Sequence, residues 1–274
     1  MTIQDWLSSA TNQLDDVGIP SGKLDAEIIL AHTLRHSRTW IHAYNNEPLP
    51  SREHDIADAR LDLRLQRVPI AYIVGHKEFY GRRFMVNPSV LVPRPESETI
   101  IDIIGELIAK TPAQDRHLKL IDIGTGSGAL GTTAKLLHPS LDVTLLDISN
   151  HALNVARKNA KTLHAEVEIQ TSDLLDDYPV KADYILANLP YVDKTWTDLS
   201  PETKHEPAVA LFASEGGLDL IYRLIDSVAG SLNARGITIL EADPTQHDHI
   251  IARAETAGLQ LVETRDYCVV LQAK

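Results

Sequence analysis

Cysteine is almost absent from this chain of 274 residues, since Cys268 is the only one. A single thiol excludes an intramolecular disulfide framework and any metal site built from several cysteines. Apolar runs are also short, and none approaches the roughly 20 residues that a membrane-spanning helix needs. Because Asp5 and Gln13 interrupt the first 14 residues, we expect neither a signal peptide nor a membrane anchor there.

Basic residues are scarce compared with acidic ones. The chain has 26 lysines and arginines against 38 aspartates and glutamates, a net charge of −12, and no basic tract longer than Arg82-Arg83. A wide surface that follows nucleic-acid phosphates is therefore disfavoured. The remaining composition, with 43% hydrophobic and 23% charged residues, is typical of a folded globular protein.

The first part of the chain has the apolar spacing of amphipathic helices. Thr2, Ser21 and Ser51 are candidates for the residues at which three of these helices begin. Aromatic and β-branched residues around Gly81 then indicate a hairpin. We expect three parts: a helical bundle at residues 1–75, a hairpin connector at 76–95 and a larger domain at 96–274.

Short apolar runs alternate with helical segments in the larger domain. The expected strands lie at 118–123, 141–146, 167–169, 184–187 and 237–240, with two further candidates at 259–262 and 268–271. Helical spacing separates several of them, as at 151–163 and 218–232. This alternation predicts an α/β fold with a doubly wound, mostly parallel, Rossmann-like sheet.

The first expected strand leads into a glycine-rich turn, Gly124-Thr125-Gly126-Ser127-Gly128. Glycine permits a positive φ and a close approach of a ligand, and the following helix offers free amide groups. Asp147 lies about 20 residues further on, where a carboxylate can bind two ribose hydroxyls. Gly124, Gly126 and Gly128 match the G-x-G-x-G turn of S-adenosylmethionine enzymes, whereas Gly126, Gly128 and Gly131 match the dinucleotide pattern G-x-G-x-x-G. Asp122, just before the turn, favours a cationic ligand such as S-adenosylmethionine over a pyrophosphate.

The fourth expected strand ends at Asn188-Leu189-Pro190-Tyr191. Strands of an open α/β sheet face the ligand crevice at their carboxyl ends, so this tetrad should lie beside the glycine turn. The Asn188 side-chain oxygen and a main-chain carbonyl can accept hydrogens from a planar NH2 group, and Tyr191 can stack on its face. Acceptors that hold both hydrogens make such a delocalised nitrogen a better nucleophile. The two motifs together favour methyl transfer over hydride transfer.

These motifs, with Val-Leu-Val-Pro-Arg-Pro-Glu-Ser-Glu at 90–98, resemble the PrmC/HemK family of S-adenosylmethionine-dependent glutamine methyltransferases. The resemblance covers nearly the whole chain and implies a class I methyltransferase domain behind a small N-terminal helical bundle. It implies methylation of N5 of the glutamine in the Gly-Gly-Gln motif of peptide-chain release factors, with the bundle gripping the release factor. We expect a cytoplasmic monomer that binds neither membranes nor, stably, nucleic acids.

The resemblance also implies a role for each matching residue. The expected cofactor-binding residues are Asp122, Gly124, Thr125, Gly126, Ser127, Gly128, Asp147, Ile148, Asp173, Leu174 and Asn188. The expected substrate-binding residues are Asn188, Leu189, Pro190 and Tyr191, with Arg94 and Glu96 as supports of the active-site floor. Asn188, Pro190 and Tyr191 are the expected catalytic residues, and no metal is expected. Leu189 stands where the family usually has proline, and we expect the turn geometry to survive this change.

Three alternatives stay open at this point. The Asn-Leu-Pro-Tyr spelling also resembles adenine-N6 methyltransferases of ribosomal RNA, which bind a flipped-out base through the same geometry. The acidic net charge, the 90–98 segment and the N-terminal place of the extra domain disfavour that alternative. A glutamine methyltransferase of a ribosomal protein would share every motif. A nicotinamide-dependent oxidoreductase would leave the Asn188 tetrad unexplained.

Overall fold

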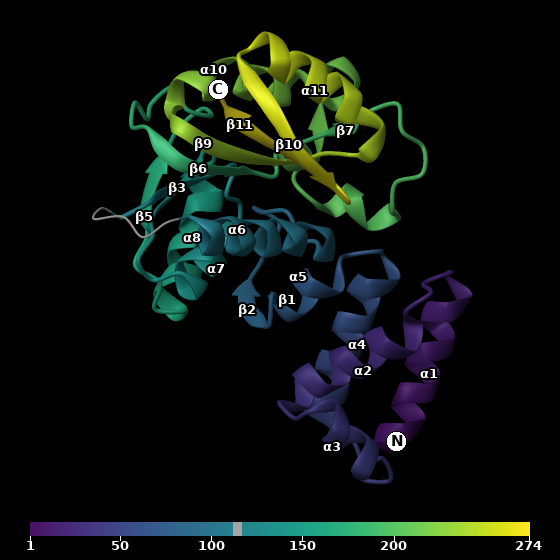
Figure 1. The fold of residues 1–274 in the computed structure, drawn as a ribbon. Coiled ribbons are helices and arrows are strands. Elements are labelled where there is room, and N and C mark those ends of the chain that lie inside the picture. The colour runs from purple at the N-terminus through teal and green to yellow at the C-terminus, as the bar shows by residue number, and fades with distance from the viewer. Residues whose placement is uncertain (112–116) are drawn as a thin grey trace. The chain divides into compact units, whose positions relative to one another are not determined.

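The computed structural model describes residues 1–111 and 117–274, and the chain forms two compact units. The first unit consists of Met1–His76 together with Ser200–His205, and the second of Lys77–Leu199 with Glu206–Lys274 (Figure 1). Each unit has its own apolar core. A short piece from the second half of the chain therefore belongs to the N-terminal unit.

The first unit is a helical bundle. Its helices are α1 (Ile3–Asp16), α2 (Gly22–Leu34), α3 (Arg38–Ala43), α4 (Ser51–Leu65) and α5 (Ile70–Val74). Thr2 caps α1, because its hydroxyl accepts from the Asp5 amide at 3.1 Å and the Asp5 carboxylate accepts from the Thr2 amide at 2.9 Å. The helices expected near Thr2, Ser21 and Ser51 are confirmed, and α3 and α5 are additional.

Ser200–His205, which we call the strap, joins the bundle through charged groups. The guanidinium of Arg64, only 5% exposed, donates to Glu202 at 2.9 Å and to Asp25 at 2.7 Å. Arg67 donates to the same Glu202 carboxylate at 3.2 Å. Sequence patterns do not predict this attachment, because the strap lies about 135 positions beyond Arg67.

The second unit contains a seven-stranded sheet in the order β10-β11-β9-β6-β3-β4-β5. Its strands are β3 (Lys119–Ile123), β4 (Asp142–Asp147), β5 (Glu168–Thr171), β6 (Ala182–Ala187), β9 (Leu232–Glu241), β10 (Leu259–Arg265) and β11 (Cys268–Ala273). All neighbours are parallel except the pairs that involve β11. The predicted doubly wound, mostly parallel sheet is confirmed.

Helices cover both faces of this sheet (Figure 1). One face packs against α6 (Glu98–Lys110), α7 (Ala129–Leu137) and α8 (Asn150–Thr162), and the other against α10 (Asp219–Ser231) and α11 (His247–Thr256). Successive residues of β3 point to opposite faces, so Leu120 joins one apolar cluster and Ile121 the other. Burial on both sides explains why these strands are apolar throughout rather than alternating.

The strand order fixes where a ligand can bind. The chain runs outward from β3 through β4 to β5 and then returns to pair β6 with the other side of β3. This reversal opens a crevice at the carboxyl ends of β3 and β6. Ile123 pairs with Ala187, so the next residues, Gly124 and Asn188, leave the sheet as neighbours.

Smaller elements complete the chain, and all but η2 lie wholly or mainly in the second unit. They are β1 (His76–Phe79), β2 (Arg82–Met85), η1 (Pro95–Ser97), β7 (Val192–Asp193), η2 (Pro201–His205, in the strap), α9 (Ala208–Leu211), β8 (Phe212–Ala213), η3 (Glu215–Gly217) and η4 (Pro244–Gln246). The pairing of β1 with β2 confirms the hairpin expected around Gly81. Across the residues that the structure describes, every helix is too short or too polar to cross a membrane.

Candidate active site

A cavity of about 240 Å³ opens at this switch point of the second unit. The expected site residues on its wall are Gly124, Thr125, Gly126, Ser127, Asp147, Ile148, Asp173, Leu174, Asn188, Leu189 and Pro190. The other expected residues, Arg94, Glu96, Asp122, Gly128 and Tyr191, lie outside the wall. The structure therefore brings most of the predicted residues to one cavity and leaves five behind or beside it.

The glycine turn, Gly124–Gly128, needs its glycines for their backbone conformation. Gly124, Gly126 and Gly128 have φ values of +65°, +54° and +80°, which residues with a Cβ rarely adopt. The Gly128 amide donates to the Thr125 carbonyl at 2.8 Å, which closes the turn. The turn thereby exposes backbone, rather than side chains, to the cavity.

Asp122 braces the glycine turn from behind the cavity. Its Oδ2 accepts from the Thr125 hydroxyl at 2.6 Å and from the Gly131 amide at 2.9 Å. Its Oδ1 has no hydrogen-bond partner among the described residues. Burial raises the pKa of Asp122 to about 6, so the carboxyl is mostly ionised at pH 7. Asp122 can therefore favour a cationic ligand through its field, without contact.

Asp147 points into the cavity at the end of β4. Its two oxygens accept from the Gly126 amide at 2.9 Å and from the Ser149 amide at 2.8 Å. Burial raises its pKa, and the two amides fix the plane of the carboxylate. Because each carboxylate oxygen has a second lone pair, Asp147 can accept from two further hydroxyls, as the ribose assignment requires.

The cavity becomes apolar beyond Asp147. Ile148 is 58% exposed although its side chain is aliphatic, and Leu174 holds a left-handed backbone with φ of +50°. Asp173 lies beside them and forms an ion pair with Arg223 at 3.0 Å. A flat heterocycle would be enclosed by apolar side chains here, with polar groups at its edge.

We call the turn Asn188–Tyr191 the amide site, and its first three residues form the opposite wall. Nδ2 of Asn188 donates to the Ser97 hydroxyl at 2.9 Å. Among the described residues no hydrogen bond occupies Oδ1, so this oxygen can serve the cavity. Leu189 is 5% exposed and its Cδ2 lies 3.0 Å from the position that a Cβ on Gly124 would take. Leu189 therefore packs the amide site directly against the glycine turn.

Tyr191 lies behind the cavity wall. Its hydroxyl donates to Oε1 of Glu241 at 3.3 Å, and its carbonyl accepts from Gln246 at 2.9 Å. Burial, followed by the charge of Glu241, raises the pKa of Tyr191, so the phenol stays neutral. Stacking of this ring on a substrate stays a prediction.

Sequence reasoning missed three buried polar residues: Ser97 and Glu241, which bond to the amide site, and Glu206, which bonds to Arg94. Arg94 forms an ion pair with Glu206, and Glu206 also accepts from the Val92 amide at 3.2 Å. Burial raises the pKa of Glu241 to about 7. Ser97 lies in the 90–98 segment that carries the resemblance, but only the folded chain shows its hydrogen bond to Asn188.

Comparisons with known proteins agree with this geometry. Residues 5–75 match the family model of the PrmC N-terminal domain, and residues 96–223 match the methyltransferase small domain. A release factor glutamine methyltransferase from Koribacter versatilis is 37% identical over 253 residues, with 89% of each chain covered. The chain belongs to the release factor glutamine methyltransferase family. A second member, from Bacillus anthracis, is 36% identical, with 82% of this chain and 81% of that protein covered.

A solved structure shows the same fold. The 16S rRNA N2 G1207 methyltransferase of T. thermophilus, in complex with AdoMet and guanosine, aligns with a TM-score of 0.53 and 16% identity. The match covers 73% of this chain and 49% of that one. The predictions of the family, the methyltransferase class and S-adenosylmethionine as methyl donor are confirmed. A nicotinamide-dependent oxidoreductase is excluded by the same findings.

The cavity fits the methyl donor of this family. The glycine turn offers backbone close to the ligand, Asp147 offers two fixed acceptors, and Asp122 supplies a negative charge behind the turn. These are the groups that a sulfonium, an amino acid end and a ribose require. A dinucleotide pyrophosphate would instead meet a negative field.

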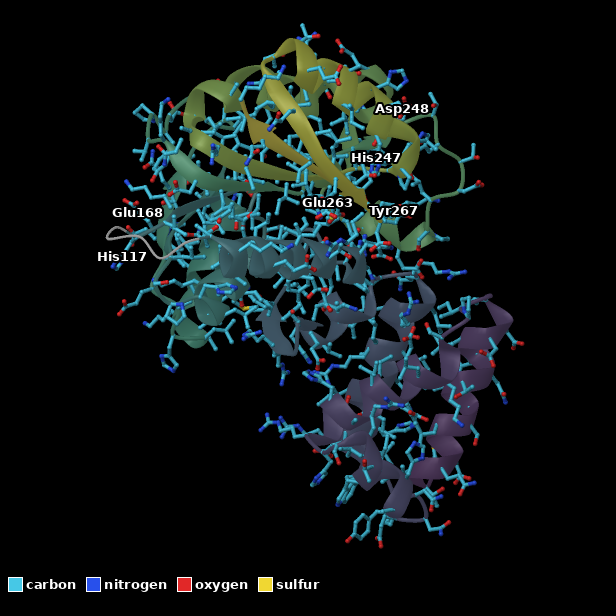
Figure 2. The ribbon with its side chains drawn as sticks, in the orientation of Figure 1. His117, Glu168, His247, Asp248, Glu263 and Tyr267 are labelled. Carbon is cyan, nitrogen blue, oxygen red and sulfur yellow. The ribbon has the colours of Figure 1, made fainter. Side chains whose placement is uncertain are left out.

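Metal-binding side chains are scattered. His247 and Asp248 begin α11, whereas Glu263 and Tyr267 lie on the last hairpin (Figure 2). His247 is 9% exposed, with Nε2 3.4 Å from the Ala242 carbonyl. Within 1–111 and 117–274, there is no group of three histidines, cysteines or acids that could hold a metal ion.

Proposed function

We propose that this methyltransferase modifies N5 of the glutamine in the Gly-Gly-Gln motif of peptide-chain release factors, giving N5-methylglutamine. One observation carries the proposal: Asn188 donates its Nδ2 to Ser97 and so presents Oδ1 to the cavity that also contains the glycine turn. An acceptor at this place suits the NH2 group of a primary amide. The names of the family members support the release factor as the protein that carries it.

We assign the cofactor to the wall formed by the glycine turn. Gly124–Gly128 would hold the methionine end, Asp147 the two ribose hydroxyls, and Ile148, Asp173 and Leu174 the adenine. S-adenosylmethionine supplies an electrophilic methyl group when it is bound. The Asp147 carboxylate is preorganised for its role, because two backbone amides already fix its plane.

We assign the substrate amide to the wall formed by the amide site. Oδ1 of Asn188 and the carbonyl of Leu189 or Pro190 accept its two hydrogens, which aims the nitrogen and returns electron density to it. Methyl transfer to the nitrogen would leave S-adenosylhomocysteine and release one amide proton to water. No strong base is needed before attack, because this proton becomes acidic as the new C–N bond forms. We propose that the ring of Tyr191 lies against the flat face of the substrate amide. We propose that Arg94 and Glu96 support the floor of the active site.

The remaining assignments concern the whole chain. We propose that residues 1–75 recognise the release factor, that 76–95 connect them to the catalytic part, and that 96–274 form the methyltransferase domain. The match of residues 5–75 to the PrmC N-terminal domain supports the first assignment. The enzyme would act as a cytoplasmic monomer without a stable nucleic-acid partner, in keeping with its net charge of −12.

A competition assay tests the proposal. Purified enzyme, labelled S-adenosylmethionine, release factor, ribosomal proteins and deproteinised ribosomal RNA are incubated together, and peptide mass spectrometry locates the methyl group. We expect one methyl on the Gly-Gly-Gln glutamine. Label in RNA adenine would instead support an adenine-N6 methyltransferase of ribosomal RNA. Label in a ribosomal protein glutamine would support a glutamine methyltransferase of that ribosomal protein.

A further inference from the structure

Glu241 is a buried acid that the proposed chemistry does not use. It ends β9 with 1% of its surface exposed. Its Oε1 accepts from the Tyr191 hydroxyl at 3.3 Å, whereas Oε2 has no hydrogen-bond partner among the described residues. A buried carboxylate oxygen without a partner costs stability, and such costs are typical of functional sites.

Ser97 connects this acid to the cavity. Its side chain is almost fully buried, at 3% exposure, and its oxygen accepts from Nδ2 of Asn188 at 2.9 Å. A hydroxyl that accepts a hydrogen bond still has its own proton to donate. Ala187 pairs with Leu240 in the sheet, so Asn188 and Glu241 follow as neighbours at the ends of β6 and β9. Ser97 and Asn188 both act to lower the pKa of the Glu241 carboxyl, against the rise that burial causes, although neither completes a hydrogen bond to Oε2.

We propose that Glu241 is a positioning residue that sets the orientation of the Asn188 amide through Ser97. The ionised carboxylate attracts the Ser97 proton, so Ser97 can only accept from Asn188. Nδ2 of Asn188 is then turned to Ser97, and Oδ1 is turned to the cavity. This inference rests on the proposed function, in which Oδ1 holds the substrate amide; Glu241 itself lies outside the cavity wall.

The substitution Glu241→Gln removes the negative charge of the side chain and keeps its shape. Its side-chain NH2 group can donate to Ser97, whose proton then turns toward Asn188. An Asn188 amide that rotates to accept this proton directs NH2, a donor, into the cavity. The substrate NH2 would then meet a donor instead of an acceptor.

The same logic gives a pH dependence. The groups that face Glu241 are Tyr191, Cys268 opposite it on β11, and the exposed Glu96, whose charge opposes ionisation. Burial raises the pKa of Tyr191, and that of Cys268 to about 12, so both stay neutral near pH 7. Glu241, with a pKa of about 7, is therefore the member of this group that ionises there, and kcat should rise with pH across this value.

The test measures kcat, KM and cofactor affinity of the full-length enzyme with release factor. In Glu241→Gln and in Ser97→Ala we expect kcat to fall by at least about tenfold, the scale of a mispositioned group, with an unchanged Kd for S-adenosylmethionine. The rise of kcat near pH 7 should disappear in Glu241→Gln. Glu255→Gln, at an exposed position of α11, is the matched control and should keep both values.

Three outcomes decide the inference. An unchanged kcat and pH profile in a folded Glu241→Gln variant would overturn it. If that variant does not fold, Ser97→Ala decides, because it keeps the carboxylate and removes only the connecting hydroxyl. Rescue by Ser97→Thr, which restores a hydroxyl, would support the inference over a purely structural role.

A separate measurement distinguishes failure of this inference from failure of the proposed function. The side-chain 15N resonance of Asn188, recorded in free enzyme, reports its hydrogen bonds without any turnover. We expect it to shift in Glu241→Gln and in Ser97→Ala even if release factor proves not to be the substrate. An unshifted resonance in both variants would reject the positioning role on its own.

Discussion

The two walls of the cavity are built in different ways. The glycine turn is held by groups close in sequence: Asp122 lies nine positions from Gly131, and Asp147 lies 21 from Gly126. The amide site is held by distant groups, since Asn188 bonds Ser97 across 91 positions and Tyr191 bonds Glu241 across 50. The wall proposed for the cofactor, which we call the cofactor wall, is therefore a local motif. The wall proposed for the substrate, which we call the substrate wall, depends on the complete fold.

This difference suggests that one wall serves cofactor binding and the other serves substrate selection. A wall of backbone amides and one fixed carboxylate binds a ligand whose shape does not change between enzymes of this fold. A wall of side chains from Ser97 and the segment after β6, with Glu241 of β9 outside it, can be altered residue by residue to suit different substrates. Substitutions on the two walls should accordingly damage different quantities.

The largest expected effect is on the substrate wall. Asn188→Ala removes the Oδ1 acceptor, and we expect kcat to fall by about 1,000-fold, as for other preorganised polar groups. Cofactor affinity, measured by calorimetry, should hardly change. Asn154→Ala, at an exposed position of α8, is the control. Equal losses of kcat and cofactor binding in Asn188→Ala would break the proposed separation of the two walls.

The next effect concerns the cofactor wall. Asp147→Ala removes two acceptors for ribose, each worth about 1.5–3 kcal/mol in a charged hydrogen bond, so Kd for S-adenosylmethionine should rise by at least about 100-fold. Asp142→Ala changes the exposed acid at the other end of the same strand and should leave Kd unchanged. Calorimetry at one pH compares the Kd for S-adenosylmethionine of the two variants. Similar Kd values would contradict the assignment of Asp147 to the ribose hydroxyls.

Asp122 should make the free energy of unfolding depend on pH. Its folded pKa of about 6 lies above the unfolded value, so the native state binds the proton more tightly between about pH 4 and 6. The free energy of unfolding should therefore fall as pH rises through this window, by about 2–3 kcal/mol. Urea unfolding of Asp122→Asn should lack this part of the slope. Parallel slopes for both proteins would show that Asp122 does not titrate as a buried acid.

The smallest expected effect concerns packing behind the glycine turn. A Cβ on Gly131 would lie 2.3 Å from Leu145 and 2.9 Å from Cβ of Asp122, so Gly131→Ala should cost about 1–3 kcal/mol of unfolding free energy. Gly230 in α10 has open space around it, and Gly230→Ala should be neutral or stabilising by up to about 1 kcal/mol. Denaturant unfolding measures both, and equal effects would mean that α7 can shift away from β3.

The sequence predicts the fold and the cofactor wall because their signals are local. Apolar runs separated by helices predict the strands, and Gly124, Gly126 and Gly128 have the positive φ that their spacing indicates. Thr2 precedes Asp5 at the spacing of a capping box, and the structure contains that capping box. Each of these features depends on residues within about one helical turn or one strand-helix unit.

The rest depends on contacts that no short pattern encodes. Tyr191 and Asp122 are predicted to serve the ligand, and both lie outside the cavity lining, where each makes a hydrogen bond to a neighbouring side chain. Ser97 and Glu241 lie far apart in the sequence, and only the parallel pairing of β6 with β9 brings Glu241 to the amide site. A motif identifies which residue types are present, whereas side-chain direction follows from packing.

The strap has a consequence for how the protein can be divided experimentally. Residues 77–274 expressed alone would retain Ser200–His205 without Arg64 and Arg67, and residues 1–76 alone would leave the buried Arg64 with one carboxylate partner fewer. Neither fragment contains the complete set of these ion pairs, although the two family models match separate parts of the chain. A gene cut at residue 76 therefore divides one buried ion network between two polypeptides, and co-expression of the two pieces is the arrangement that can restore it.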